Sequence, residues 1–147
     1  DRVQRSHPVE VAAVAAGGAA GAALRYALGL AAPWQPPDFP WVTLTVNLVG
    51  CLGIGVALVA LTEVVAAPGW LRPAIAPGFL GGFTTFSAFA VESVRLTDAG
   101  AAGTAAVYVA VSVLAGLLLV RFGAVATRRR LVGPVVTKGS SDVEEGI

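Results

Sequence analysis

The chain has 147 residues, of which 56% are hydrophobic and only 13% are charged. Soluble domains carry about 25% charged residues, so a water-soluble fold of this length could not bury so much apolar surface. The net charge of +1 does not suggest nucleic acid as a partner. We see no nucleophile–base pair and no cluster of metal ligands, so no enzyme class is favoured. Because the sequence holds no methionine, we expect that it lacks its encoded start or that the first residue was removed.

Four long apolar runs follow one another, at about residues 9–32, 41–67, 70–96 and 99–122. Each can cross a hydrocarbon core of about 30 Å, and the first is too long for the core of a cleaved signal peptide. Short connections rich in Pro and Gly separate them. We therefore predict an all-α membrane protein of four transmembrane helices at 9–122. Residues 1–8 would form an N-terminal tail and 123–147 a polar, disordered C-terminal tail.

The first run combines small residues with one charge. Gly17 and Gly21 are four residues apart, a spacing that lets helix backbones approach closely. Arg25 lies about seven residues before the end of the run. It could extend to the membrane interface, or it could hold an anion in a watery vestibule. The residue alone does not decide between these two interpretations.

Asn47 in the second run lies six residues past Trp41, roughly 9 Å into the span. Its amide could donate a hydrogen bond to an anion or bond a neighbouring helix.

The third run contains helix-disrupting residues near its middle. Pro77 removes a helical hydrogen bond, and Gly81 and Gly82 loosen the backbone. We predict a break in this helix, with a simple proline kink as the alternative. Carbonyl groups freed by a break must be buried or used, and unwound carbonyls often hold Na⁺.

An aromatic stripe follows the predicted break. Phe83, Phe86 and Phe89 recur at a spacing of three and would share a helix face, beside a row formed by Thr84 and Ser87. Such a stripe fits plain packing or lipid contact. It could also line a pore, because the electropositive edges of aromatic rings can stabilise an anion.

In the fourth run, Tyr108 and Ser112 are four residues apart and would share a face. Their hydroxyls could extend a polar path or bond a neighbouring helix.

Lys and Arg residues are distributed unevenly. With four spans, eight of the ten lie on the side of the two termini, and only Arg25 and Arg95 lie toward the other. The positive-inside rule predicts cytoplasmic termini.

The segment 81–89, GGFTTFSAF, closely resembles the third-helix signature of the CrcB or Fluc fluoride channel family. The segment 43–50, TLTVNLVG, resembles the second-helix motif of that family, and 21–26, GAALRY, resembles its first-helix motif. The resemblance covers about residues 9–122 and implies a fluoride-specific channel in the plasma membrane. It also implies an antiparallel dimer with two pores. We expect the termini of this chain in the cytoplasm.

The resemblance implies a role for each matching position. Phe86 and Phe89 would line the pore with Asn47, and Arg25 would belong to the vestibule. Backbone oxygens of Gly81 and Thr84 would hold a structural Na⁺ at the dimer centre. Further path residues would be Thr85, Ser87, Tyr108 and Ser112.

The sequence differs from the family pattern at several positions. Ala88 and Ala90 stand where hydroxyl residues are common, and Val42 stands where glycine is common. The charge bias suggests one fixed orientation, so this chain could need an oppositely oriented paralogue as its partner. An antiparallel dimer of two copies of this chain is the alternative.

Two other functions remain open on the sequence. A small proton-coupled cation or multidrug exporter would need a carboxylate inside the membrane, but Glu10, Glu63 and Glu92 lie near the ends of the runs. The chain could also be the non-conducting subunit of a heterodimeric channel.

Overall fold

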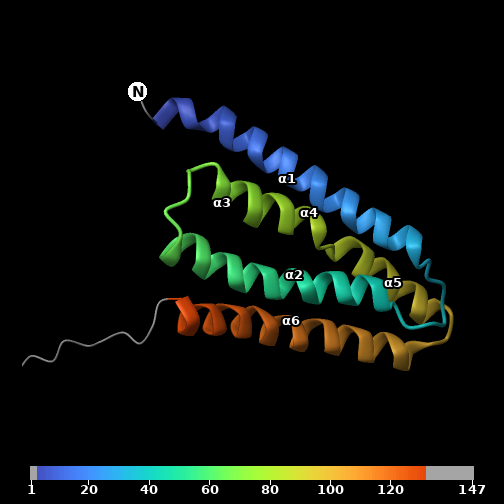
Figure 1. Cartoon of the computed structure of the whole chain (residues 1–147). Coiled ribbons are helices and arrows are strands. Elements are labelled where there is room, and N and C mark those ends of the chain that lie inside the picture. Colours follow the sequence, from blue (N-terminus) through green and yellow to red (C-terminus); the bar gives the residue numbers. More distant parts are fainter. Residues whose placement is uncertain (1–2, 132–147) are drawn as a thin grey trace, which may run out of the picture.

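The computed structural model describes residues 3–131, and side chains from residue 8 onward. Four of its helical segments are long and apolar enough to cross a membrane, as the sequence predicts. The first span belongs to α1, and the second is formed by α2 and the π-helix η1 (Figure 1). The third span is composite, and α6 forms the fourth. The bounds of these elements are α1 Val3–Ala31, α2 Trp41–Val59, η1 Ala60–Val64 and α6 Ala102–Leu131.

Both ends of the predicted domain need correction. Helix α1 begins at Val3, within the expected tail 1–8, and α6 continues to Leu131, well past residue 122. Residues 123–131 include three Arg, two Ala and one Leu, which are strong helix formers. The change to polar sequence therefore marks where the apolar surface ends, and the helix continues beyond it. The rest of the predicted C-terminal tail, 132–147, lies outside the described residues.

The third span consists of several helical pieces, which are α3 Leu71–Pro73, η2 Ala74–Leu80, α4 Gly81–Phe83 and α5 Phe86–Asp98. Thr84 (φ −77°, ψ 157°) and Thr85 (φ −146°, ψ 119°) are extended between α4 and α5. The extended residues lie after Gly81 and Gly82, which are themselves helical. Pro77 lies inside the π-helix η2, where wider turns accommodate it.

The glycines of α1 and α4 serve close packing. A Cβ atom at Gly21 would overlap the carbonyl oxygen of Phe79, and one at Gly82 would overlap that of Gly18. Helix α1 accordingly lies against η2 and α4, and α2 lies against α6 (Figure 1). The predicted role of the Gly17 and Gly21 spacing is confirmed, since a Cβ at Gly17 would overlap the carbonyl oxygen of Ala74.

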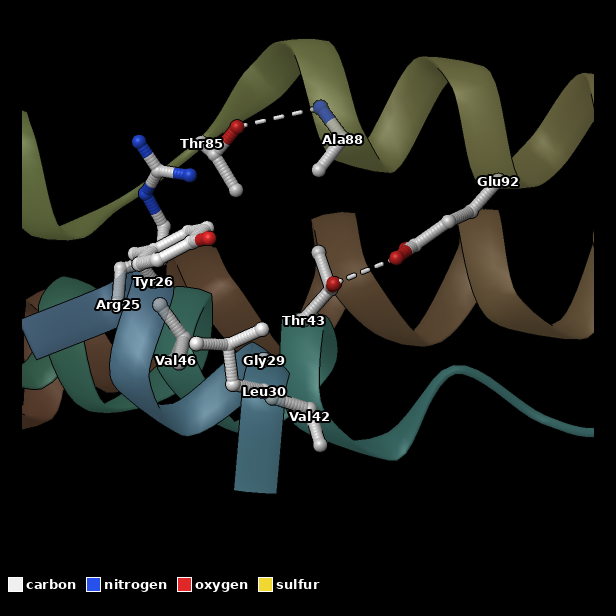
Figure 2. Close-up of a pocket in the computed structure, with 10 residues that line it drawn as sticks. All are labelled: Arg25, Tyr26, Gly29, Leu30, Val42, Thr43, Val46, Thr85, Ala88 and Glu92. Atoms are coloured by element: carbon white, nitrogen blue, oxygen red, sulfur yellow. Dashed lines mark hydrogen bonds between the residues drawn. The ribbon is translucent and has the colours of Figure 1, made fainter. Parts of the chain in front are cut away.

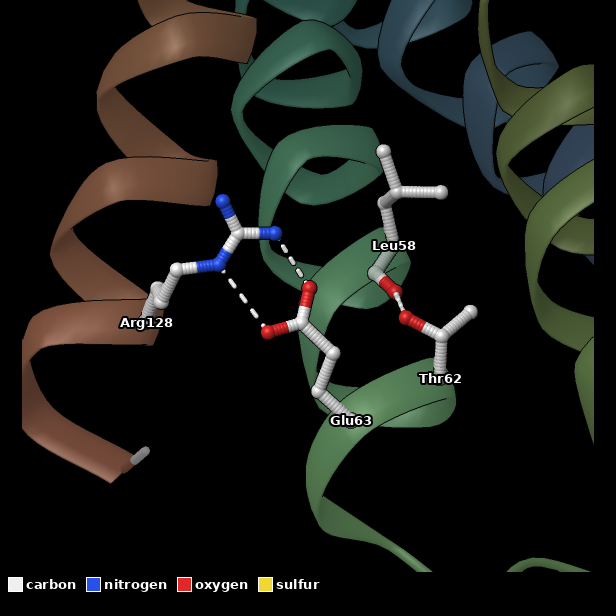
Figure 3. A network of polar contacts seen from close by, with 4 residues as sticks. All are labelled: Leu58, Thr62, Glu63 and Arg128. Atoms are coloured by element: carbon white, nitrogen blue, oxygen red, sulfur yellow. Dashed lines mark hydrogen bonds and ion pairs between the residues drawn. The ribbon is translucent and has the colours of Figure 1, made fainter. Parts of the chain in front are cut away.

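An ion pair links two elements at one end of the bundle. The start of α1, the α2–α3 connection and the end of α6 lie at one end, and the other two connections lie at the opposite end (Figure 1). At the first end, Arg128 of α6 forms an ion pair with Glu63 of η1, in which Nε lies 2.9 Å from Oε2 (Figure 3). This pair ties the polar last turns of α6 to the end of the second span.

Near the opposite end, Leu44, Leu96, Ala105 and Tyr108 form a buried cluster that joins α2, α5 and α6. Phe39 and Trp34 from the α1–α2 connection pack against it. The Tyr108 and Leu96 side chains are fully buried, so α5 is firmly held at its end away from Thr85.

Candidate functional site

Asn47 holds the extended Thr85 in place. Its Nδ2 donates to the Thr85 carbonyl oxygen at 3.0 Å, and its Oδ1 accepts from the Thr85 N–H at 2.8 Å. The side chain of a residue on α2 thus pairs with both backbone polar groups of Thr85, whose N–H makes no helical hydrogen bond. Of the two interpretations of Asn47, bonding to a neighbouring segment is the one seen here.

Threonine side chains complete the transition between the helices. Thr85 Oγ1 accepts from the Ala88 N–H at 3.1 Å, which caps the N-terminus of α5, and lies 3.2 Å from Ser87 Oγ. Thr84 Oγ1 donates back to the Leu80 carbonyl oxygen at 2.9 Å. The expected row of Thr84 and Ser87 is therefore wrong, because the extended residues turn these two hydroxyls toward different partners.

A cavity of about 290 Å³ lies beside this segment. Thr84 and three residues without a predicted role form part of its wall. The rest of the wall consists of five residues that the sequence predicts for an ion path. Those five are Asn47, Thr85, Phe86, Phe89 and Ser112. Ser112 Oγ is buried and has no hydrogen-bond partner among the described residues. An unpaired buried hydroxyl is costly, and here it lines a cavity where a ligand could accept a hydrogen bond from it.

Phe86 and Phe89 are neighbours at the cavity but differ in their surroundings. Their ring centroids are 5.7 Å apart, and Phe89 also lies 5.3 Å from the Tyr108 ring. Phe86 is 80% exposed. The expectation that Phe83 shares their face is wrong. Phe83 precedes the extended residues, is buried, and stacks on Phe79 at 5.9 Å.

Arg25 lines a second cavity of about 310 Å³, which Thr85 also borders (Figure 2). Its Nε donates to the Gly82 carbonyl oxygen at 3.3 Å. The side chain is therefore turned toward the protein, beside the Thr84–Thr85 segment. Since Thr85 lines both cavities, this segment separates the Arg25 side from the Phe86 side.

Sequence reasoning missed the position of Glu92. Its Oε1 accepts from Thr43 Oγ1 at 2.7 Å (Figure 2), and its Oε2 accepts from Tyr108 OH at 2.7 Å. The carboxylate thus joins α2, α5 and α6. The available signal was an acidic residue one turn after Phe89 in an apolar run, together with hydroxyl residues on the two neighbouring spans.

The remaining predicted residues lie around the site without lining its cavities. The Tyr108 hydroxyl bonds Glu92, which is the interhelix alternative for this residue. Gly81 is exposed, and a Cβ there would meet nothing closer than 4.0 Å. Ser87 is exposed beside Thr85.

Comparison with known proteins identifies the family. The family model described as "CrcB-like protein, Camphor Resistance (CrcB)" matches residues 12–124, which is most of the chain. The chain belongs to this family. The match confirms the resemblance found in the three sequence motifs and, with the four spans, indicates a multi-pass membrane protein.

Several relatives of this chain are named as fluoride channels. "Fluoride-specific ion channel FluC 1" of Streptomyces coelicolor is 47% identical over 86% of this chain and 82% of its own length. "Fluoride-specific ion channel FluC 2" of Streptomyces avermitilis is 50% identical over 68% of this chain and 63% of its own. "Fluoride-specific ion channel FluC" of Rhizobium etli is 43% identical over 84% of this chain and 99% of its own.

Proposed function

We propose that the chain is a subunit of a fluoride-specific ion channel in the plasma membrane. The family membership and the names of its relatives support this function. The observation that carries the proposal for this chain is the cavity at the start of α5. There, two phenylalanine rings, the Asn47 amide and the unpartnered Ser112 hydroxyl converge between membrane-spanning helices.

The chemistry of this cavity suits a small anion. Fluoride is strongly hydrated, so groups of the protein must replace its lost water. The Ser112 hydroxyl has no partner within residues 3–131, and Asn47 Nδ2 keeps one N–H beyond its bond to Thr85. The first amides of α5 have no acceptor within the helix, and a helix N-terminus attracts negative charge. Ring edges of Phe86 and Phe89 add weak electropositive contacts, so the ion is solvated without being trapped.

Residues around this cavity have roles in the proposed ion path. Arg25 attracts the anion on the far side of Thr85, and the hydroxyls of Thr85 and Ser87 lie along the path. Asn47 has a double role, since its bonds to Thr85 also fix the point where α5 begins. Tyr108 acts through Glu92 and Phe89, which it positions, and makes no contact with the ion.

A second chain would complete the path. Phe86 is 80% exposed although it borders the cavity, so a single subunit leaves that wall open to lipid. We propose that an antiparallel partner covers it, either a second copy or an oppositely oriented paralogue. Labelling of the C-terminus from each side of intact cells distinguishes these cases. A homodimer requires labelling from both sides, whereas the charge bias and a paralogue partner predict cytoplasmic labelling alone.

The same segment suits a structural Na⁺. In a continuous helix, the Gly81 carbonyl would accept from the Thr85 N–H, but that N–H bonds Asn47 Oδ1. The Thr84 carbonyl would accept from the Ala88 N–H, which instead bonds Thr85 Oγ1. Both carbonyls therefore lack their helical donors, and neutral oxygens of this kind suit a monovalent cation. When bound, Na⁺ would supply positive charge that joins the two chains at Gly81 and Thr84.

Passive export explains how such a channel lowers fluoride toxicity. Fluoride enters cells as the neutral acid, dissociates at cytoplasmic pH, and leaves through the channel down its electrochemical gradient. Cells that express the chain in acidic medium should accumulate several-fold less fluoride than cells with an empty vector. Equal accumulation would contradict the proposal.

The position of Glu92 supports one alternative function, that of a proton-coupled exporter. Its carboxylate lies inside the helix bundle, where such an exporter needs one. The two functions separate in liposomes made with the purified chain. A channel releases fluoride without a pH gradient, whereas an exporter takes up a cationic dye only when a pH gradient is imposed. The same preparation tests the non-conducting subunit, because that chain alone would release no fluoride.

A further inference from the structure

A groove leads from the Arg25 cavity to the end of α5. A third cavity, of about 270 Å³, is bordered by Trp34 and Arg95. Several residues line both this cavity and the Arg25 cavity, so the two are parts of one groove between α1, α2 and α5. The shared residues are Gly29, Val42, Thr43, Ala88 and Glu92.

The charges along this groove alternate. Arg25 borders the first part of the groove, beside Thr85, and Glu92 borders both cavities. Arg95 borders only the third cavity, which is the outer part of the groove, and lies three residues before α5 ends. Among the residues that line the outer cavity, Arg95 is the one cation and Glu92 the one anion. A carboxylate at this position repels an approaching anion, so entry from this end depends on the charge that offsets it.

The Arg95 guanidinium is held at the opening by an aromatic ring. Its Cζ lies 5.6 Å from the centroid of the Trp34 ring, within cation–π range. Trp34 is itself fixed, since its Nε1 donates to the Asp38 carbonyl oxygen at 2.6 Å and its ring packs on the Leu44 and Tyr108 cluster. Arg95 forms no ion pair with any carboxylate in the part of the chain that the structure describes. Its charge is therefore positioned at the opening without being neutralised in a contact.

We propose that Arg95 is the anion-recruiting residue of the outer opening, where it offsets Glu92 and raises the local fluoride concentration. This inference rests on the proposed fluoride channel and adds a residue that governs entry. A fixed charge at an opening acts through space, so its effect depends on ionic strength. Screening is weak at about 10 mM, where the Debye length is about 30 Å, and strong at about 300 mM, where it is only about 6 Å.

The test compares fluoride release from liposomes by the wild-type chain, Arg95→Gln and Arg95→Lys at these two ionic strengths, set with potassium gluconate. Arg72→Gln is the matched control, because Arg72 is also exposed but lies at the opposite end of the third span. Arg95→Gln should slow release about threefold at low and less than about 1.5-fold at high ionic strength. Arg95→Lys should keep most of the wild-type rate at both, and Arg72→Gln should match the wild type.

Three results would overturn the inference while leaving the channel itself intact. They are an unchanged rate in Arg95→Gln at low ionic strength, an equal loss at both ionic strengths, and a lysine variant as slow as the glutamine variant. The latter two would mean that Arg95 supports the fold through Trp34 and does not recruit the ion by its charge. The failure of the proposed function looks different, since wild-type liposomes would then release no more fluoride than empty ones.

Discussion

The Asn47 side chain bonds both the N–H and the carbonyl of Thr85, thirty-eight positions further along the chain. This pair of hydrogen bonds connects α2 to the point where the third span changes from α4 to α5. It makes Asn47 a determinant of backbone geometry as well as a candidate donor to the ion.

Replacing Asn47 separates these two contributions. Asn47→Leu leaves two polar groups of a buried residue without partners, and we expect a loss of about 2 kcal/mol or more in stability. Asn47→Asp keeps the acceptor for the Thr85 N–H but brings a negative charge to the cavity. We expect it to reduce fluoride flux at least about tenfold with a smaller loss of stability. Unfolding in detergent and flux in liposomes measure the two effects. Wild-type stability in Asn47→Leu would contradict the role of the hydrogen bonds.

Phe86 and Phe89 should respond differently to the same substitution. Phe86→Ile and Phe89→Ile should both lower fluoride flux strongly, because each removes a ring edge from the cavity. Phe89 also contacts the Tyr108 ring, so Phe89→Ile should destabilise the subunit by about 1 kcal/mol, whereas the exposed Phe86 should show little effect before a partner is bound. Both variants should still form dimers in chemical cross-linking. Undiminished flux in both would count heavily against the assigned path.

The two hydroxyl groups that donate hydrogen bonds to the Glu92 carboxylate offer a third test. Tyr108→Phe removes one donor and Thr43→Val the other, and each leaves a carboxylate oxygen unpaired. We expect each single variant to cost about 1–3 kcal/mol. The double variant should lose more than the sum, because a carboxylate without either donor would have to be protonated or solvated. Strictly additive losses, measured by unfolding in detergent, would show that Glu92 is solvated in both singles.

Gly50 tests how closely α2 approaches the Thr84–Thr85 segment. A Cβ atom at Gly50 would overlap Thr84 Cγ2, so Gly50→Ala should displace Thr84 and lower flux. The control is Gly103→Ala, because a Cβ at Gly103 meets nothing within 4 Å. The control should keep full flux and gain up to about 1 kcal/mol from the higher helix propensity of alanine. Equal flux in both variants would mean that Thr84 adapts without consequence.

The sequence was sufficient for the features that depend on local pattern. The lengths of the apolar runs predict the four spans, and the spacing of Gly17 and Gly21 predicts a close helix contact, which the structure shows to be with the third span. Helix ends were less predictable. Residues 123–131 are helical although they include three arginines and lie beyond the predicted span, because helix propensity and membrane burial are separate properties.

The arrangement around Thr85 depends on contacts between distant residues, which no local pattern encodes. Gly81 and Gly82 suggest loosened backbone, but both are helical, and Gly82 packs against Gly18 of α1. The bonds from Asn47 hold the extended residues at Thr84 and Thr85. Glu92 is a second case, since its partners come from α2 and α6. The roles of the path residues and of Na⁺ stay predictions that the experiments above address.

The central claim is selective fluoride conduction by this chain, and one recording tests it most directly. Liposomes containing the purified protein are loaded with potassium fluoride and potassium chloride, and ion-selective electrodes follow both anions after a potassium ionophore is added. The account predicts rapid release of fluoride while chloride stays inside. Release of both anions at similar rates, or of neither, would contradict it.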